Sequence, residues 1–249
     1  MEDLESFMAQ AVAEISALPE EGMRLAALAS RLASLGPADA ARLLDLLYKN
    51  RHDKRIAGRI LPLLVNPGGL EAGLGSQACR AIYMAAIGQG LTRVSRLFTD
   101  LPPHSRGMAG YTKEEEARME MLTLGQRRAL SKSLDKDTID RLLSDPDPMV
   151  VGNLLNNPRV TEKEVVKIAS KRPNSPVILR LIAGHRVWSK RLGVKRAVAM
   201  NPYTPPRTAL GVMESMLTQD LKAISEDDTL HRQVRAHASE IVEERKGMA

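Results

Sequence analysis

The carboxylate pairs Asp145/Asp147 and Asp227/Asp228 have the type and spacing that could serve catalysis or metal binding. Paired carboxylates act as general acid and base, or hold a cation when further ligands stand nearby. Here no histidine follows at ligand spacing, and both pairs stand in stretches that predict turns or helix starts. Because Asp is a favoured helix cap, we expect capping roles for both pairs.

The single cysteine and the five histidines suggest no further reactive site. Cys79 lies in an apolar-periodic stretch, which predicts a small buried side chain, and one cysteine excludes a disulfide framework or a cysteine-rich metal site. His231 and His237 are six residues apart and point to different sides of a helix. No phosphate loop or Gly-x-Ser-x-Gly elbow is present. We expect a non-enzymatic protein with no cofactor, metal or small-molecule substrate.

Basic residues, by contrast, gather in one part of the chain. The net charge is +6, and residues 1–100 hold 11 basic and 11 acidic residues. Residues 156–210 hold 12 basic residues against Glu162 and Glu164 alone, which gives +10 over 55 positions. Such a field attracts polyanions or acidic proteins. The candidate binding residues are Lys163, Lys167, Lys171, Arg180, Arg186, Trp188, Lys190, Arg191, Lys195 and Arg196.

Three interpretations of this basic region stay open. The cations form a solvated face that keeps an aliphatic protein soluble, or they dock an acidic protein segment, or they contact the phosphates of duplex nucleic acid. Aromatic residues make up only 3%, and Trp188 and Tyr203 alone lie nearby, which is too few for stacking single-stranded bases. Trp188 is either an exposed anchor for a partner or a partly buried spacer between helical units.

The elements that position these residues are predicted to be helices. With 43% apolar residues and almost no aromatics, the core must be aliphatic, which favours packed helices. Pro37 is expected to open one helix, and Thr123–Gln126 and Thr161–Glu164 are capping-box patterns. We also expect Asp137 and Thr204 to cap helices. On the helix after Thr161, lysines should project to solvent opposite the buried aliphatic residues Val165, Ile168 and Ala169.

An internal repeat links two of these segments. Residues 150–161 align with residues 194–205 at an offset of 44 positions, with an Asn-Pro step at Asn157-Pro158 and at Asn201-Pro202. A weaker echo stands at Asn66-Pro67. Proline disfavours the helical conformation in the residue before it, so each step should end a helix. A period of this length predicts stacked helical units that shelter one another's apolar faces, here as short helix pairs with their cations aligned in one stripe.

The turns resemble a known family of repeats. Asn157-Pro158-Arg159-Val160-Thr161, Arg172-Pro173-Asn174-Ser175-Pro176 and Asn201-Pro202-Tyr203-Thr204-Pro205 resemble the leucine-rich repeat variant pattern. The helix starts Val194-Lys195-Arg196-Ala197 and Val234-Arg235-Ala236 resemble HEAT-type repeats. The resemblance covers about residues 140–245 and implies a right-handed α-solenoid that serves as a binding scaffold. The iron–sulfur cysteines of the leucine-rich repeat variant prototype have no counterpart, since Cys79 is alone.

Together these observations predict an all-α protein with a helical N-terminal region at 1–100, a Pro- and Gly-rich linker at 101–111 and a helical repeat domain at 112–249. We expect an adaptor that docks an acidic protein partner, with duplex nucleic acid as the alternative ligand. The acidic start Met1-Glu2-Asp3 lacks the pattern of a secretory signal, and no run of about 18 apolar residues predicts a membrane span. The expected location is the cytoplasm.

Overall fold

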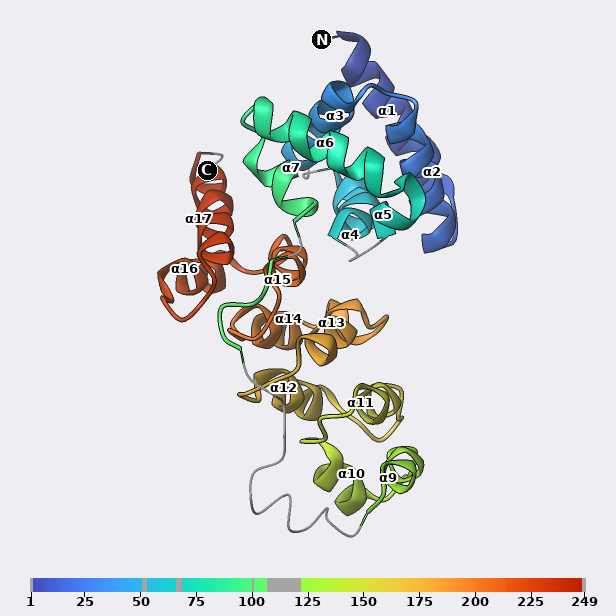
Figure 1. The fold of residues 1–249 in the computed structure, drawn as a ribbon, viewed down its shortest axis with the longest axis vertical. Helices are drawn as coiled ribbons and strands as arrows, with labels where there is room; N and C mark the ends of the chain where they lie inside the picture. Colours follow the sequence, from blue (N-terminus) through green and yellow to red (C-terminus); the bar gives the residue numbers. More distant parts are fainter. Residues whose placement is uncertain (1, 51–52, 66–68, 100, 107–121, 248–249) are drawn as a thin grey trace. The chain divides into compact units, whose positions relative to one another are not determined.

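A computed structural model describes residues 2–50, 53–65, 69–99, 101–106 and 122–247. All regular structure in these residues is helical, with no β-strand, as the composition predicts (Figure 1). The predicted turn at Asn66-Pro67 and the second part of the predicted linker, 107–111, lie outside the described residues. Among the described helices, none has both the length and the apolar character that crossing a bilayer requires.

The chain divides into two compact units, Met1–Asp100 and Leu101–Ala249, each with its own aliphatic core. Residues 101–106, which we predicted as the start of a linker, belong to the second unit. There the Ser105 amide donates a hydrogen bond to the Pro202 carbonyl at 3.0 Å.

The first unit packs its helices around leucine-rich faces. Its elements are α1 (Glu2–Ala17), α2 (Glu21–Ala33), α3 (Pro37–Lys49), a π-helical segment (Ile56–Ile60), α4 (Leu61–Val65), α5 (Gly69–Leu74), α6 (Ser76–Gly88) and α7 (Thr92–Leu97). Pro37 opens α3 as predicted, and Cys79 is buried in α6. At Gly73, a Cβ would lie 2.6 Å from the Ala29 Cβ, so glycine permits the close approach of α5 to α2.

The second unit is built from short helices at regular intervals. They are α9 (Leu124–Leu130), α10 (Lys136–Leu142), α11 (Pro148–Leu155), α12 (Glu162–Ser170), α13 (Pro176–Gly184), α14 (Leu192–Ala199), α15 (Pro206–Met213), α16 (Thr218–Glu226) and α17 (Arg232–Lys246). A 3₁₀ turn (Trp188–Lys190) precedes α14. Each helix begins 12 to 16 residues after the start of the previous one.

These helices form two rows. Row A consists of α9, α11, α13, α15 and α17, each of which contacts the next member of the row. Row B consists of α10, α12, α14 and α16, in which α12 packs directly on α14. Figure 1 shows α9, α11 and α13 on one side of the unit and α10, α12 and α14 on the other. Most helices therefore lie next to the helix two positions away in the chain.

The 44-residue repeat spans three helices and not the helix pair that we predicted. The offset carries α11, α12 and α13 onto α14, α15 and α16, so it exchanges row A for row B. This exchange is possible because the same hydrogen bonds, from an asparagine side chain to the end of a neighbouring helix, recur in both rows. Asn157, after α11, donates its side-chain amide to the carbonyls of Ser131 and Ser133, which follow α9. Asn201, after α14, donates to the carbonyls of Ala169 and Lys171 at the end of α12.

Two expected caps are wrong. Asp135, not Asp137, caps α10, and its carboxylate accepts from the Thr138 amide at 2.9 Å. Thr204 does not cap α15, which begins at Pro206; its hydroxyl instead donates to the Val198 carbonyl at the end of α14. The expected capping boxes at Thr123 and Thr161 are both present. Asp147 caps α11 through the Met149 and Val150 amides, so this carboxylate has the predicted structural role.

The separate cores lead to a first prediction. A fragment of residues 101–249 should fold alone, because its core cluster of 28 buried residues lies entirely within that range. Circular dichroism should show a helical spectrum with one cooperative thermal transition. A fragment that is unfolded at 20 °C would show that the second unit needs the first.

Candidate functional site

The outer face of α12 carries the lysines that the sequence predicts there. Lys163 and Lys167 are exposed, whereas Val165, Ile168 and Ala169 of the same helix are buried in the core. Arg186 and Lys190 are also exposed, in the segment that joins α13 to α14. Within the described part of the chain, no salt bridge joins any of these four cations to a carboxylate. They are the predicted cations with charge available for a partner.

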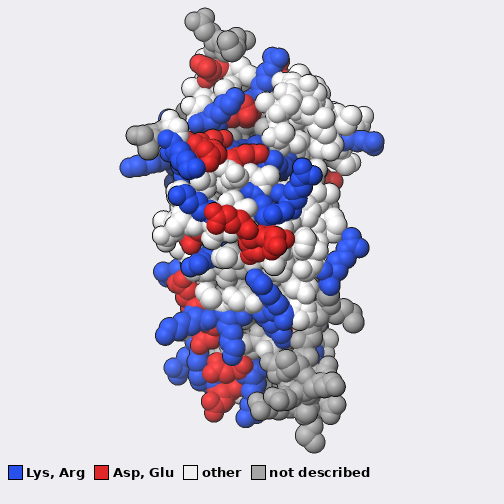
Figure 2. All heavy atoms as spheres, turned by 90° about the vertical axis from the view of Figure 1, so that its left-hand side faces the viewer, with Lys and Arg blue, Asp and Glu red and all other residues white. Residues whose placement is uncertain are grey.

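Two other predicted cations belong to ion pairs between neighbouring helices of row B. Arg191 lies 3.9 Å from Glu162 at the start of α12, and Arg196 lies 3.4 Å from Asp220 on α16. A third pair joins Lys136 of α10 to Glu164 of α12. Figure 2 accordingly shows basic side chains interleaved with acidic ones on the face that it draws. The expected single cationic stripe is therefore not formed.

Three further predicted cations are half-buried. Lys171 donates to the Ser144 carbonyl beyond the end of α10 at 2.7 Å. Lys195 donates to the Ser215 hydroxyl at 2.5 Å, and burial lowers the pKa of its ammonium group. Arg180 lies on α13, which belongs to row A. Lys171 and Lys195 therefore bond within the second unit.

Trp188 has the geometry of a spacer between helices. Its indole N–H donates to the Leu155 carbonyl, the last residue of α11, at 2.7 Å, and its ring packs against the core. The ring of His185 stacks beside it with centroids 6.2 Å apart. Burial, and to a lesser extent the charge of Arg186, lowers the pKa of His185. Trp188 thus ties α13 and the following turn to the end of α11.

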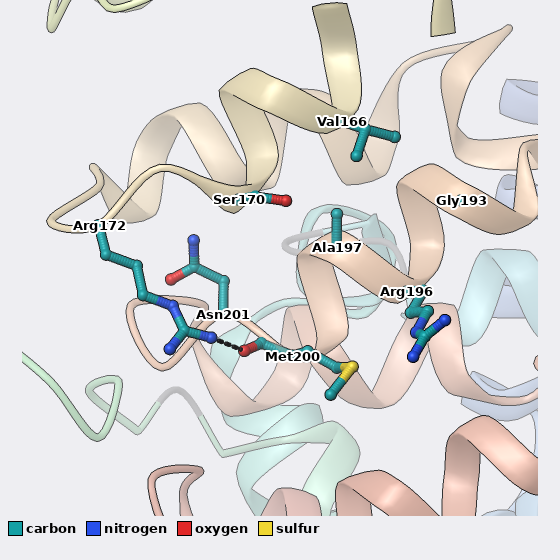
Figure 3. A pocket seen from close by; sticks show the side chains of 8 residues that line it. All are labelled: Val166, Ser170, Arg172, Gly193, Arg196, Ala197, Met200 and Asn201. Atoms are coloured by element: carbon teal, nitrogen blue, oxygen red, sulfur yellow. Dashed lines mark hydrogen bonds between the residues drawn. The ribbon is translucent and has the colours of Figure 1, made fainter. Parts of the chain in front are cut away.

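A pocket that the sequence did not suggest lies between α12 and α14 (Figure 3). Its volume is about 370 Å³, and its lining residues are Val166, Ser170, Arg172, Gly193, Arg196, Ala197, Met200 and Asn201. Arg196 was a candidate binding residue, but Arg172 was not. The two arginines are 24 positions apart in sequence, and only the side-by-side packing of α12 and α14 brings them to one pocket.

Reactive groups do not converge on this surface. Among the described residues, no group of three or more His, Cys, Asp and Glu side chains could hold a metal ion. An enclosed titratable pair lies elsewhere, where His237 Nε2 of α17 is 3.1 Å from Glu214 Oε1 after α15.

Comparisons with known proteins assign no family. The chain matches no protein-family model, no curated protein and no solved structure. Any proposal about this surface therefore rests on its own charges and geometry.

Glu164 gives a prediction about stability and pH. Burial raises the pKa of its carboxyl, but hydrogen bonds from Lys136 and Thr161 outweigh that effect and lower it from 4.5 to about 2. Because the pKa of Glu164 is lower in the folded state, its ionised carboxylate stabilises the protein fully above pH 4.5, the ordinary pKa of the group. This stabilisation is lost as the pH falls toward 2. Glu164→Gln keeps an acceptor for the capping box and removes the charge, so it should lower the free energy of unfolding at pH 7 by roughly 1 kcal/mol.

The measurement is urea denaturation of the wild-type chain and the variant at pH 7 and at pH 3. The difference between them should be smaller at pH 3. Glu162→Gln on the same helix is the control, because its pair with Arg191 is longer and exposed; its effect should be less than half as large. Equal effects of the two substitutions, or a difference that does not change with pH, would contradict this assignment.

Proposed function

We propose that the second unit is a right-handed α-solenoid of HEAT-like or leucine-rich-repeat-variant type, and that it is a non-enzymatic adaptor that docks an acidic protein segment. Support for the architecture comes from the two rows, in which helices contact the helix two positions away. Such stacking leaves long outer faces that are open to a partner. The face that we propose for docking is the outer surface of row B around α12.

The observation that carries this proposal is four exposed cations, Lys163 and Lys167 on α12 and Arg186 and Lys190 in the segment that joins α13 to α14. They stand in a region with a formal charge of +10, and their charges are not matched by salt bridges within the described part of the chain. Unpaired charges of one sign create a field that steers an oppositely charged partner. The acidic partner supplies the missing carboxylates.

The interleaved acidic side chains favour a protein partner over duplex nucleic acid. Glu162 and Asp220 stand among the cations of row B. A duplex presents phosphates at fixed, close spacing, so some of them would meet these carboxylates. A flexible peptide can turn its carboxylates toward the cations and away from Glu162 and Asp220. The duplex stays as the competing ligand in the test below.

The test is the double substitution Lys163→Glu and Lys167→Glu on the exposed side of α12. The probe is a fluorescein-labelled 20-residue polyglutamate peptide, followed by fluorescence anisotropy at 150 mM salt, where weak long-range attraction is screened. Because two attractive contacts become repulsive, we expect binding to weaken at least tenfold, about 1.4 kcal/mol.

The matched control is Lys54→Glu with Arg80→Glu. Both residues are exposed in the first unit, and the change in net charge is the same. An equal loss in the control would mean that the peptide responds to net charge alone and not to α12. If a random 20-base-pair duplex bound tightly while the peptide did not bind, the adaptor proposal would be wrong and the nucleic-acid alternative would replace it.

A further inference from the structure

The pocket between α12 and α14 follows from how these helices pack. Glycine at position 193 allows a close approach, since a Cβ there would lie 2.9 Å from Glu162 Oε1 and 3.6 Å from Val166 Cγ2. Toward the other end of the helices, the short side chains of Ser170 and Ala197 leave the space between them unfilled. The pocket extends from Gly193, near the start of α14, to Met200 and Asn201 after its end.

The floor of this pocket is apolar and its rim is cationic. Val166, Ala197 and Met200 supply aliphatic and thioether surface, and Figure 3 shows Arg172 and Arg196 on opposite sides of the opening. No Asp or Glu is among the lining residues. Two acidic side chains stand beside the pocket, Glu162 near Gly193 and Asp220, whose carboxylate lies 3.4 Å from Arg196 Nε.

Both arginines keep donors for a ligand. One N–H of Arg172 donates to the Met200 carbonyl at 2.7 Å, which fixes the guanidinium beside the pocket. Arg196 is 56% exposed, and its Nε lies 3.4 Å from Asp220. A guanidinium has five N–H donors, so each arginine still has others for a carboxylate.

The helix ends at this opening do not repel an anion strongly. Helices carry partial negative charge at their C-termini, where the last carbonyls lack partners. Here the Asn201 amide donates to the carbonyls of Ala169 and Lys171, and Arg172 satisfies that of Met200. Arg172 therefore brings positive charge to the end of the pocket at Met200 and Asn201, whereas Arg196 shares its charge with Asp220.

We propose that this pocket binds one aliphatic side chain of an acidic peptide, while carboxylates on either side of that side chain pair with Arg172 and Arg196. This inference rests on the proposed docking function and names the sequence feature that the docked segment must carry. A volume of about 370 Å³ lies at the lower end for ligand pockets, which suits a single side chain. An apolar anchor in a pocket with a polar rim is also the usual arrangement of a binding hot spot.

The experiment compares two labelled 11-residue peptides, each with five glutamates on either side of a central residue, which is leucine in one and serine in the other. Burying a leucine side chain contributes about 1.5 to 3 kcal/mol, so the wild-type chain should bind the leucine peptide at least tenfold more tightly. Anisotropy at 150 mM salt gives both dissociation constants.

Ser170→Leu should fill the pocket from the exposed end of α12 and remove this preference, so that the two peptides bind within twofold of each other. Ser239→Leu is the matched control, because Ser239 is exposed on α17 and outside the pocket; it should keep the tenfold preference. Circular dichroism of both variants shows that they are folded.

The outcomes separate the two proposals. If the wild-type chain binds both peptides equally, or if Ser170→Leu keeps the preference, the pocket does not take the apolar side chain, while docking of an acidic segment stands. If neither peptide binds, the docking function itself is wrong, and the pocket inference is wrong with it.

Discussion

The second unit depends on hydrogen bonds to the ends of its very short helices. The carbonyls there have no partner within the helix and need donors from elsewhere. A helix of seven to nine residues leaves about half of its carbonyls without an internal partner. In this unit a side chain from the segment two helices later commonly donates to those carbonyls. Asn157 serves the end of α9, Lys171 that of α10, Trp188 that of α11, Asn201 that of α12 and Arg245 that of α15. Because each donor must reach a particular helix end, this bonding fixes which helices lie side by side.

The same bonding determines which charges remain for a partner. Lys171 and Arg172 lie next to each other at the end of α12, and each donates to a carbonyl of a different row B neighbour, so part of the positive charge of this region is structural. The ion pairs of Arg191 and Arg196 hold row B together in a similar way. Lys163 and Lys167 differ because they lie on the exposed side of α12 and make no salt bridge within the described residues. Function is therefore better inferred from the exposed cations that make no such structural bond than from the total charge of the region.

Local signals in the sequence were enough to predict many of the elements. The capping boxes at Thr123 and Thr161 and the opening of α3 at Pro37 need only residues within one helical turn. Helix α2 was not predicted, since it begins after Glu20 without a side-chain cap. The cap of α10 was assigned two residues late, because Asp135 and Asp137 both precede Thr138 and only the backbone conformation decides between them. The prediction for Asn-Pro steps was incomplete: proline explains why the helix ends, but the amide of Asn201 bonds to carbonyls 30 and 32 residues earlier.

The candidate site was harder to predict for the same reason. Exposure of Lys163 and Lys167 follows from helical periodicity, but the pairing of Arg196 with Asp220 and the pocket beside Arg172 depend on which helices pack together.

The central claim, that buried side-chain amides hold the stacked helices in place, is tested most directly by urea denaturation of Asn157→Ala beside Asn156→Ala. Asn157 is 6% exposed and bridges to another helix end, whereas Asn156 is exposed, donates to Gly152 of its own helix and has only a 3.4 Å contact with His185 Nε2 after α13. We expect Asn157→Ala to lower the free energy of unfolding by about 2 kcal/mol and Asn156→Ala by less than about 0.5 kcal/mol. Equal effects of the two substitutions would contradict the account.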